Sequence, residues 1–392
     1  MDALKNSLKK VLPPPVESFM REVNRITAME EQNRKLIMQL QDRIDKQNQL
    51  LQQKNREIKQ LEQSLRYNVE SVQELKSMLS RTLEQQNKKL DYRTNTINRE
   101  ISYRYLKGLH PDQYREALEE WFYQHTMTKL DLDHPETFSE KIQWLKLYDS
   151  TAEKSRLADK YLVRDWIKEK IGEEYLIPLL GVWGRFDDID FDILPDQFVL
   201  KANHGSGWNI IVHDKETLDL EATRVKFNNW MKKNFAFCNG LELHYKDIEP
   251  KIIAEKYISK DTNSLNDYKF FCFNGNIELI WVDTNRYEGQ HIRNIYSPDW
   301  ELLPVTKDYP NDTSMDLKPG CYEKMNELAR ILCKDFICVR VDFYEVDGKI
   351  YFGEMTFTSG SGYGSFHPLE FDYELGSKLK LPNELDEKIR RE

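Results

Sequence analysis

A continuous heptad repeat near the N-terminus limits what this chain can fold into. Residues 26–89 contain no glycine or proline and are dense in Gln, Glu, Lys, Arg and Leu, a composition that favours helix. If Ile37 takes position a of a heptad, all the later a positions are aliphatic: Ile44, Leu51, Ile58, Leu65, Val72 and Leu79. One helix alone cannot bury so narrow a stripe, so the repeat predicts a coiled coil over residues 26–90 and a homo-oligomer.

The d positions of the repeat are less regular, and about half are polar: Leu40, Gln47, Lys54, Leu61, Asn68, Leu75 and Thr82. Polar seam residues fix register or oligomeric state at a cost in stability. The alternative is a single solvated helix stabilised by i,i+4 charge pairs, which does not explain the unbroken a positions. At about 1.5 Å per residue, the stretch 37–79 would be about 64 Å long and would also act as a spacer.

Composition limits where the protein works and what it binds. The net charge of −9 argues against broad nucleic-acid binding, which needs a surplus of Lys and Arg. The five cysteines form no CxxC pair, so they suggest neither a zinc ribbon nor a disulfide framework and fit a reduced compartment. No apolar run approaches the roughly 18 to 20 residues of a membrane span, and the N-terminus lacks the apolar core of a signal peptide. We therefore expect a cytoplasmic protein without a transmembrane segment.

The segments on either side of the heptad repeat have different textures. Residues 1–25 are expected to be disordered; the alternative is a short basic amphipathic turn in peripheral contact with a membrane, formed by Leu4, Lys5, Leu8, Lys9, Lys10, Val11 and Leu12. Residues 91–180 predict helices rich in aromatics, and Thr137 followed by Glu140 marks the start of one of them. Residues 181–392 alternate strand-like runs such as FVLKAN and CVRVDFYEV with helices such as YEKMNELARILCKDF. An α+β catalytic region follows from this order.

The run FVLKANHGSGWNIIV is the first stretch that suggests chemistry. Lys201 leaves the end of an apolar strand, and the loop of Gly205, Ser206 and Gly207 can bring backbone N–H groups close to phosphate oxygens. The alternative is an ordinary glycine turn of a β-hairpin, and the GxxxxGK[ST] pattern of a P-loop is absent.

Two acidic residues flank a second turn, Val346-Asp347-Gly348-Lys349, which is typical of a hairpin. Asp342 and Glu354 lie twelve positions apart around this turn, so they can converge on one edge of a sheet. Two hard oxygen ligands on rigid strands suit Mg²⁺ completed by water and nucleotide phosphates. The alternative is a pair of surface acids. Lys269, within the apolar run YKFF, is a third candidate, because a buried lysine must be paired if it is not at the surface.

In this order the pieces resemble the ATP-grasp superfamily and, within it, the TupA-like ATP-grasp proteins of teichuronopeptide and polysaccharide gene clusters. The resemblance covers roughly residues 100–382 and runs through TFSEKIQWLKLYD, ADKYLVRDWI, EEYLIPLLGVW, FVLKANHGSG, IIAEKYI, DYKFFCFNG and VRVDFYEVDGKIYFGEMTF. It implies an α+β domain of two lobes with ATP bound between them, together with Mg²⁺, behind a helical segment and the coiled coil.

The resemblance also implies roles by position. Lys160 and Lys201 match the two nucleotide lysines, residues 204–207 match a lid over the phosphates, and residues 255–258 match the hinge that reads adenine. The implied nucleotide set is Lys160, Lys201, His204, Gly205, Ser206, Gly207, Glu255, Lys256, Tyr257 and Ile258. Lys269 matches the basic residue that faces the γ-phosphate, and Arg340 stands beside Asp342 as a second catalytic candidate. The implied metal ligands are Asp342, Glu354 and Thr356.

Two departures from the family pattern restrict what can be carried over. Thr356 stands where the pattern has asparagine, which leaves the number of metal ions open. The Rossmann-like domain that usually precedes the lobes is missing, so the acceptor cannot be inferred by analogy.

The expected function is a ligase that joins the carboxylate of a uronic acid, in a surface polysaccharide, to an amine or amino acid through an acyl phosphate. Arg340 and Lys269 would stabilise charge on the transferred phosphoryl group. The loop of residues 358–367 would hold the acceptor; its alternative is a flexible glycine-serine linker.

Three other functions are weighed against the ligase. One is a kinase that acts on a sugar or lipid-carrier hydroxyl, and another is a coiled-coil scaffold that binds nucleotide only. The intact Lys160, Lys201, Asp342 and Glu354 argue against the scaffold. Glycosyl transfer is the third, and the sequence offers no convincing DxD motif after a strand to support it.

Overall fold

The computed structural model describes residues 21–33, 35–36, 84, 86, 93–259, 265–284 and 291–382. The chain divides into two compact units, Met1–Leu109 and His110–Glu392. In the first unit, residues 21–33 and 93–108 are helical, and the Arg104 Nη1 atom lies 3.9 Å from Met29 Sδ, so the two helices touch. Residues 21–25 therefore correct the expectation of disorder up to residue 25; they contain no glycine or proline to prevent helix.

The seam of the predicted coiled coil lies outside the described residues, since every a position from Ile37 to Leu79 does. The coiled coil and the homo-oligomer therefore stay predictions. Within the described part of the chain, no helix is long and apolar enough to cross a membrane.

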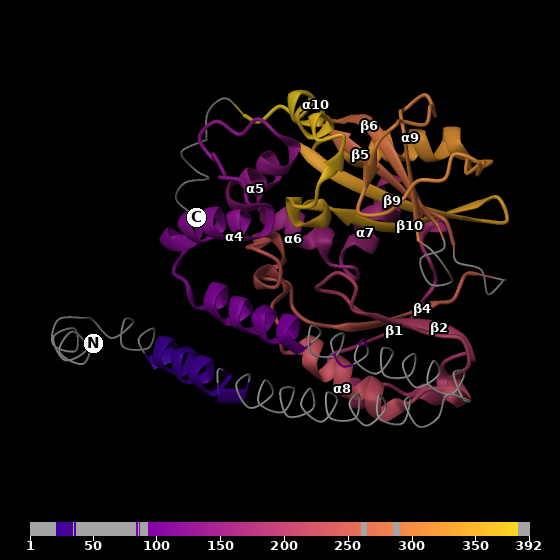
Figure 1. Ribbon diagram of the computed structural model, residues 1–392. Helices are drawn as coiled ribbons and strands as arrows, with labels where there is room; N and C mark the ends of the chain where they lie inside the picture. Colours follow the sequence, from indigo (N-terminus) through magenta and orange to yellow (C-terminus); the bar gives the residue numbers. More distant parts are fainter. Residues whose placement is uncertain are drawn as a thin grey trace, which may run out of the picture. The chain divides into compact units, whose positions relative to one another are not determined.

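The second unit contains two antiparallel sheets, which Figure 1 shows one above the other. The smaller sheet has the order β1-β4-β2-β3, and its strands are β1 (Leu179–Trp183), β4 (Ile252–Lys256), β2 (Phe198–Ala202) and β3 (Asn209–Val212). Helix α8 (Leu220–Met231) packs against β2, where the fully buried Phe227 joins Phe198 and Leu200 in one apolar cluster. This sheet and its helix form the first lobe.

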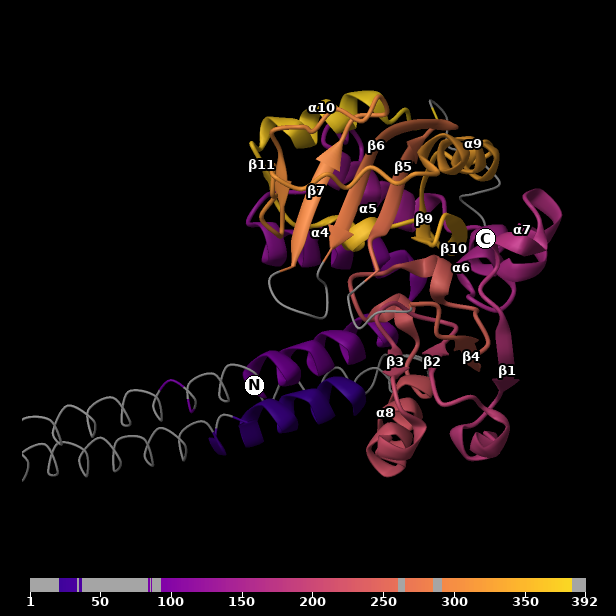
Figure 2. The same ribbon diagram turned by 90° about the vertical axis from the view of Figure 1, so that its right-hand side faces the viewer.

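The larger sheet has the order β10-β9-β5-β6-β7 and forms the second lobe. Its strands are β10 (Lys349–Thr356), β9 (Cys338–Val346), β5 (Asp267–Phe273), β6 (Asn276–Thr284) and β7 (Ile292–Tyr296). Helix α9 (Tyr322–Cys333) packs on β5, β6 and β9 (Figure 2). Its Tyr322 ring stacks on Phe270. Because side chains alternate along a strand, Phe270 on the α9 face places Lys269 on the opposite face.

Helices precede and follow the sheets: α4 (Tyr114–Thr126), α5 (Phe138–Tyr148), α6 (Ala152–Ala158), α7 (Val163–Lys170) and α10 (Glu370–Lys378). Helix α5 begins where the sequence predicts, because Thr137 accepts a hydrogen bond from the Glu140 backbone and the Glu140 carboxylate accepts one from the Thr137 backbone. It packs against α10 and against the short helix η8 (Ser359–Gly362). A two-stranded sheet of β8 (Thr306–Lys307) and β11 (Phe366–His367) completes this side.

Short 3₁₀ turns link these elements: η1 (Pro111–Gln113), η2 (Glu173–Tyr175), η3 (Phe186–Asp188), η4 (Phe191–Ile193), η5 (Lys215–Thr217), η6 (Phe235–Phe237) and η7 (Leu243–Tyr245). The β9–β10 hairpin is the connection that matters most for the site. Its turn residues Asp347 and Gly348 have positive φ angles of 53° and 74°, and Val346 pairs with Lys349, so the predicted hairpin turn is confirmed.

Candidate active site

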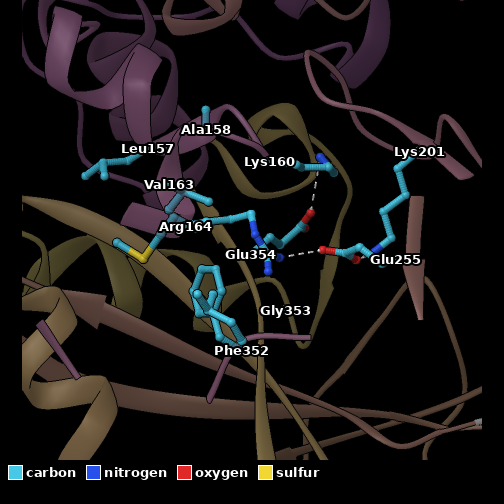
Figure 3. Close-up of a pocket in the computed structure, with 12 residues that line it drawn as sticks. Leu157, Ala158, Lys160, Val163, Arg164, Lys201, Glu255, Phe352, Gly353 and Glu354 are labelled. Carbon is cyan, nitrogen blue, oxygen red and sulfur yellow. Dashed lines mark hydrogen bonds and ion pairs between the residues drawn. The ribbon is translucent and has the colours of Figure 1, made fainter. Parts of the chain in front are cut away.

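A pocket that is partly open to solvent lies where α6, α7 and the smaller sheet meet β10 (Figure 3). One side of it is apolar and the other carries charge. Its lining consists of Leu157, Ala158, Lys160, Val163, Arg164, Leu176, Lys201, Glu255, Phe352, Gly353, Glu354 and Met355. Four residues singled out from the sequence, Lys160, Lys201, Glu255 and Glu354, are therefore brought together from four separate segments of the chain.

The first charged group of the pocket is centred on Glu255. Lys201, on β2, and Glu255, on the neighbouring β4, are 2.5 Å apart from Nζ to Oε2. Arg164, on α7, donates from Nη1 to Glu255 Oε1 at 3.1 Å and from Nη2 to the carbonyl oxygen of Ile177 at 2.8 Å. Two cations thus hold one carboxylate that is 9% exposed at the side of the pocket. Arg164 has no counterpart in the sequence prediction, because nothing in its local sequence indicates a partner 91 positions away.

Lys160 connects the two sides of the pocket. Its Nζ atom donates to the carbonyl oxygen of Gly205 at 2.6 Å and lies 3.7 Å from Glu354 Oε2, toward which it points in Figure 3. The neighbouring Asp159 accepts a hydrogen bond from Asn203 Nδ2 at 2.9 Å, so the segment that carries Lys160 is fixed to the end of β2. An ammonium group between a glycine loop and a carboxylate is placed to contact phosphate oxygens.

The glycine loop of residues 204–207 connects the paired strands β2 and β3. The β-hairpin turn and the lid over the phosphates, which the sequence offered as alternatives, are therefore the same segment. His204 is buried, with Nδ1 3.2 Å from Asn203 Oδ1 and Nε2 3.2 Å from the carbonyl oxygen of Trp230; burial lowers its pKa. This ring packs inside the lobe instead of facing the pocket. A Cβ on Gly205 would meet Trp208 and Phe235 at 2.7 and 2.8 Å, which explains the glycine. Ser206 and Gly207 are exposed.

The expected hinge leaves the end of β4, and Glu255 is its residue at the pocket. Lys256 is exposed, and its backbone N–H donates to the carbonyl oxygen of Pro178 at 2.9 Å. Tyr257 and Ile258 are half-buried, and the Tyr257 ring lies edge-on to His213. The adenine-reading role of residues 256–258 stays a prediction.

Asp342 and Glu354 lie opposite each other on the paired strands β9 and β10. This pairing depends on a bulge at Gly353, because Phe352 pairs with Phe343 while Glu354 pairs with Asp342. Without the bulge, Glu354 would pair with Val341 and point to the other face of the sheet. The predicted convergence of the two carboxylates is therefore present in the structure, through a backbone feature that the sequence did not reveal.

Arg340 binds both acids. Its Nε and Nη2 atoms donate to the two Asp342 oxygens at 2.7 and 2.6 Å, and Nη2 also donates to Glu354 Oε1 at 2.9 Å. Although burial alone would raise the pKa of Glu354, the positive charges of Lys160, Arg340 and Lys269 lower it to about 2. Glu354 is thus ionised at every physiological pH and is the acid that faces the pocket.

Lys269 is buried and paired, which is one of the two alternatives that the sequence left open for it. Its Nζ atom bonds to Asp267, donates to Asp342 Oδ2 at 3.0 Å and lies 4.0 Å from Asp283 Oδ2. The lysine does not belong to the pocket lining described above, so its predicted contact with a γ-phosphate would require it to leave these carboxylates.

The loop after β10 is fixed by bonds from several elements. Arg340 Nη1 donates to Ser359 Oγ at 3.0 Å, and Lys146 Nζ, from α5, donates to Ser361 Oγ at 2.7 Å. Gln143 Nε2 donates to the carbonyl oxygens of Ser361 and Gly362 at 3.1 and 2.8 Å. These bonds favour a shaped loop beside the acids over the flexible linker.

The donor set fits one Mg²⁺ ion, because the two acids offer only hard oxygen atoms from rigid strands. Glu354 Oε2 faces the pocket, while Asp342 already accepts three hydrogen bonds from Arg340 and Lys269. The Thr356 hydroxyl donates to Glu354 Oε1 at 3.1 Å and so supports that acid. Among the described residues, no group of three or more His, Cys, Asp or Glu is arranged to hold a metal, so phosphate and water would supply the other ligands.

Comparison with known proteins identifies the family of this chain. A family model described as TupA-like ATPgrasp matches residues 140–380, and the chain belongs to this family. The two-lobed α+β fold expected from the sequence is confirmed with it. A comparison with curated proteins finds no match.

Among solved structures, D-alanine–D-alanine ligase from Bacillus anthracis complexed with ATP is 19% identical, with coverage of 57% of this chain and 63% of that chain and a TM-score of 0.36. L-amino acid ligase from Bacillus licheniformis is 13% identical, with coverage of 70% and 65% and a TM-score of 0.39. The chain therefore spans less than two thirds of the length of either ligase.

Proposed function

We propose that this protein is an ATP- and Mg²⁺-dependent carboxylate–amine ligase of surface polysaccharide biosynthesis that works in the cytoplasm. The observation that supports it best is the pocket in which Lys160 faces Glu354 and Lys201 contacts Glu255, with Arg340 bonded to both Glu354 and Asp342. A cationic pocket next to two rigid carboxylates suits a nucleoside triphosphate and one divalent ion. Family membership points to the same nucleotide.

In this proposal the nucleotide lies along the pocket with its phosphates toward Lys160 and Lys201. The apolar side, formed by Leu157, Val163 and Met355, accepts the base. Glu354 and Asp342 would hold Mg²⁺, which would supply positive charge to neutralise the phosphates. Arg340 is already fixed by Asp342 and Ser359, so its guanidinium can stabilise the phosphoryl group without reorganising.

The reaction would proceed in two displacements. An acceptor carboxylate oxygen attacks the γ-phosphorus and ADP leaves, which gives an acyl phosphate. A neutral amine then attacks the acyl carbon, phosphate leaves, and the nitrogen loses a proton, which gives an amide. The loop of residues 358–367 would hold the acceptor, for which a uronic acid of a surface polysaccharide is the proposed class. The hydrogen bond from Arg340 to Ser359 of this loop supports the proposal.

The test asks what becomes of the γ-phosphate. The chain is incubated with ATP, Mg²⁺, uronic acids and a mixture of amino acids, and the acceptor is analysed by mass spectrometry. A ligase gives an acceptor that has gained an amine and lost water, together with free phosphate; hydroxylamine in place of the amine gives a hydroxamate. A kinase would leave one phosphoryl group on the acceptor and release no free phosphate, which would overturn the proposal.

A further inference from the structure

A second pocket of the unit His110–Glu392 shares no lining residue with the active-site pocket. Helix α5 supplies Lys141 and Trp144 to it, the turn after β5 supplies Asn274, and the segment after α10 supplies Lys380 and Leu381. The proposed function gives this second pocket no role, although three separate parts of the chain build it.

Hydrogen bonds to the backbone fix the polar side of the second pocket. Asn274 Nδ2 donates to the carbonyl oxygen of Lys380 at 2.8 Å, and Asn274 Oδ1 accepts from the Lys380 N–H group at 2.9 Å. Lys141 Nζ donates to the carbonyl oxygens of Gly376 and Leu379, at the end of α10, at 2.7 and 2.8 Å. The two lysines are therefore held in place at the same helix end.

These lysines give the second pocket positive charge that no acid of the described residues pairs with. Lys380 Nζ donates to the carbonyl oxygen of Ser377 at 2.6 Å, so both ammonium groups are bonded to backbone oxygens only. Burial lowers the pKa of Lys141, and the positive charge of Lys380 lowers it further, so the two groups repel each other. Asp133, an acid of the lining, is bonded at both oxygens to Arg115, at 3.0 and 2.7 Å. An anion between the lysines would relieve their repulsion, and their remaining N–H donors can bind it.

The rest of the lining is mostly apolar. It consists of Trp144, Ile337 and Leu381 together with Pro135 and Pro382. An apolar wall beside a few fixed charges is typical of a pocket for an organic ion. The combination suits a ring that carries a carboxylate.

Helix α5 lies between the second pocket and the loop of residues 358–367. Lys141 and Trp144, three positions apart, share one face of the helix and line the second pocket. Gln143 and Lys146 lie on another face and bond to Ser361 of the loop, at 3.1 and 2.7 Å. A helix is about 10 Å across, so a polymeric ligand could contact both places.

We propose that the second pocket binds a uronic acid unit of the acceptor polysaccharide, at a distance from the unit that reacts. The carboxylate of this unit lies between the two ammonium groups, and its ring packs on the apolar side. The choice of a uronic acid rests on the proposed function, which makes it the acceptor class. The protein would thus recognise its acceptor as a polymer, at two places.

Carbodiimide cross-linking locates the bound acid, because it joins a carboxylate to an amine in contact with it. The full chain is mixed with a tetramer of galacturonic acid and a water-soluble carbodiimide, and the labelled peptides are mapped by mass spectrometry. We expect an amide between the tetramer and Lys380 or Lys141. Lys378 is the internal control and should stay unlabelled by the tetramer, because it lies outside the lining and its ammonium group is near Glu278 and Glu374, at 3.7 and 3.5 Å.

Calorimetry with the same tetramer measures the contribution of charge. Lys380→Glu should weaken the affinity about tenfold, because it puts a repelling charge in place of an attracting one. Lys378→Glu makes the same change of charge two positions away and should leave the affinity within about twofold. If Lys380→Glu does not fold, Lys380→Met removes the charge alone and should weaken the affinity about fivefold. A tetramer of glucose, which has no carboxylate, should bind the wild-type chain at least about tenfold more weakly.

Three results would overturn the inference while leaving the proposed function in place. They are the absence of label at both Lys380 and Lys141, equal affinities of Lys380→Glu and Lys378→Glu for the charged tetramer, and equal affinities of the wild-type chain for the two tetramers. Failure of the proposed function looks different. A chain that is labelled at Lys380 but forms no amide from ATP, an amine and a uronic acid would keep the second pocket and lose the ligase.

Discussion

Two glutamates near the end of β10 have pKa values that are shifted in opposite directions. Glu354 lies among Lys160, Arg340 and Lys269, and these cations outweigh burial and lower its pKa to about 2. Glu242 is 4% exposed and bonded to Thr358, four residues further along the chain than Glu354, and burial raises its pKa to about 6 against the weaker pull of Lys146. Three cations, Lys160, Arg340 and Lys269, act on Glu354 and favour its ionised form. Only Lys146 acts on Glu242 in this way, and its charge does not offset the effect of burial.

The same contrast holds for the lysines. Lys160 contacts both the glycine loop and Glu354 at the edge of a pocket. Lys146 is fully buried, lies over the Trp121 ring, and has its pKa lowered to about 7 by burial. A region with surplus cations and an open pocket is ready to bind an anion, whereas buried ions bonded to a loop hold that loop in shape. We therefore expect changes in the pocket to alter catalysis and changes around Lys146 to alter stability.

Arg340→Met should have the largest effect on catalysis among the changes near the pocket. The change removes the bonds that Arg340 makes to Asp342, Glu354 and Ser359. Turnover, measured as ADP release with a uronic acid and an amine, should fall about 1000-fold, or about 4 kcal/mol, because one preorganised transition-state contact is lost. Arg330→Met, an exposed change on α9, is the control and should leave turnover unchanged. A fall of less than tenfold would reject the catalytic role.

Lys201→Ala should act on binding more than on turnover. Its Nζ atom contacts Glu255 at the side of the pocket, and Arg164 would still hold that carboxylate, so the fold should persist. We expect the affinity for ATP, measured by calorimetry, to weaken about 100-fold, or about 2.7 kcal/mol. The matched control is Lys226→Ala on the exposed side of α8. Unchanged affinity would remove Lys201 from the nucleotide site.

Only the features of the fold and pocket that depend on neighbouring residues in the sequence could be predicted from the sequence. The Asp347-Gly348 turn and the Thr137 cap are local, and both are confirmed. The regular hairpin that this turn implies would pair Asp342 with Gly353. The local pattern therefore predicts neighbouring strands for the two acids, but not the bulge that brings Glu354 opposite Asp342. A bulge depends on how the strand packs, and no residue type signals it uniquely.

Contacts between distant segments were the harder part. Arg164 reaches Glu255 across 91 positions, and Lys146 reaches Ser361 across 215, so no periodicity or spacing could reveal either. His204 shows a different limit. The family resemblance places it in the lid over the phosphates, whereas the structure buries its ring beside Asn203 and Trp230, which the sequence does not indicate; its nucleotide contact stays a prediction.

Buried ions around Lys146 should appear in the pH dependence of stability. Glu242 has a raised pKa, so its stabilising contribution is full below about pH 4.5 and is lost as pH rises through about 6. Lys146 has a lowered pKa, so its contribution is full above about pH 10.5 and is lost as pH falls through about 7. Stability contributed by this pair is therefore lowest between about pH 6 and 7.

The double variant Lys146→Met with Glu242→Gln measures this contribution by urea unfolding from pH 4.5 to 9. Relative to the double variant, the wild-type chain should gain roughly 1 kcal/mol as pH falls from 6 to 4.5, which is the larger part of the about 2 kcal/mol that a pKa raised from 4.5 to about 6 is worth over the whole titration. It should also gain stability as pH rises above 7. Glutamine keeps an acceptor for Thr358, so the comparison isolates charge. Parallel curves would show that the pair titrates normally.

Removal of residues 1–90 should have the smallest effect on the pocket. It compares the N-terminal unit of the chain with the unit that carries the pocket. All the pocket residues lie in the unit His110–Glu392, so ATP affinity should stay within about twofold of the full-length value. The unbroken aliphatic a positions from Ile37 to Leu79 would be lost, and with them the stripe that needs a partner helix. Light scattering should therefore show an oligomer for the full chain and a smaller species for the truncated one. A full-length chain that is monomeric at micromolar concentration would contradict the coiled coil, whereas loss of ATP binding in the truncated chain would mean that the N-terminal unit supports the pocket.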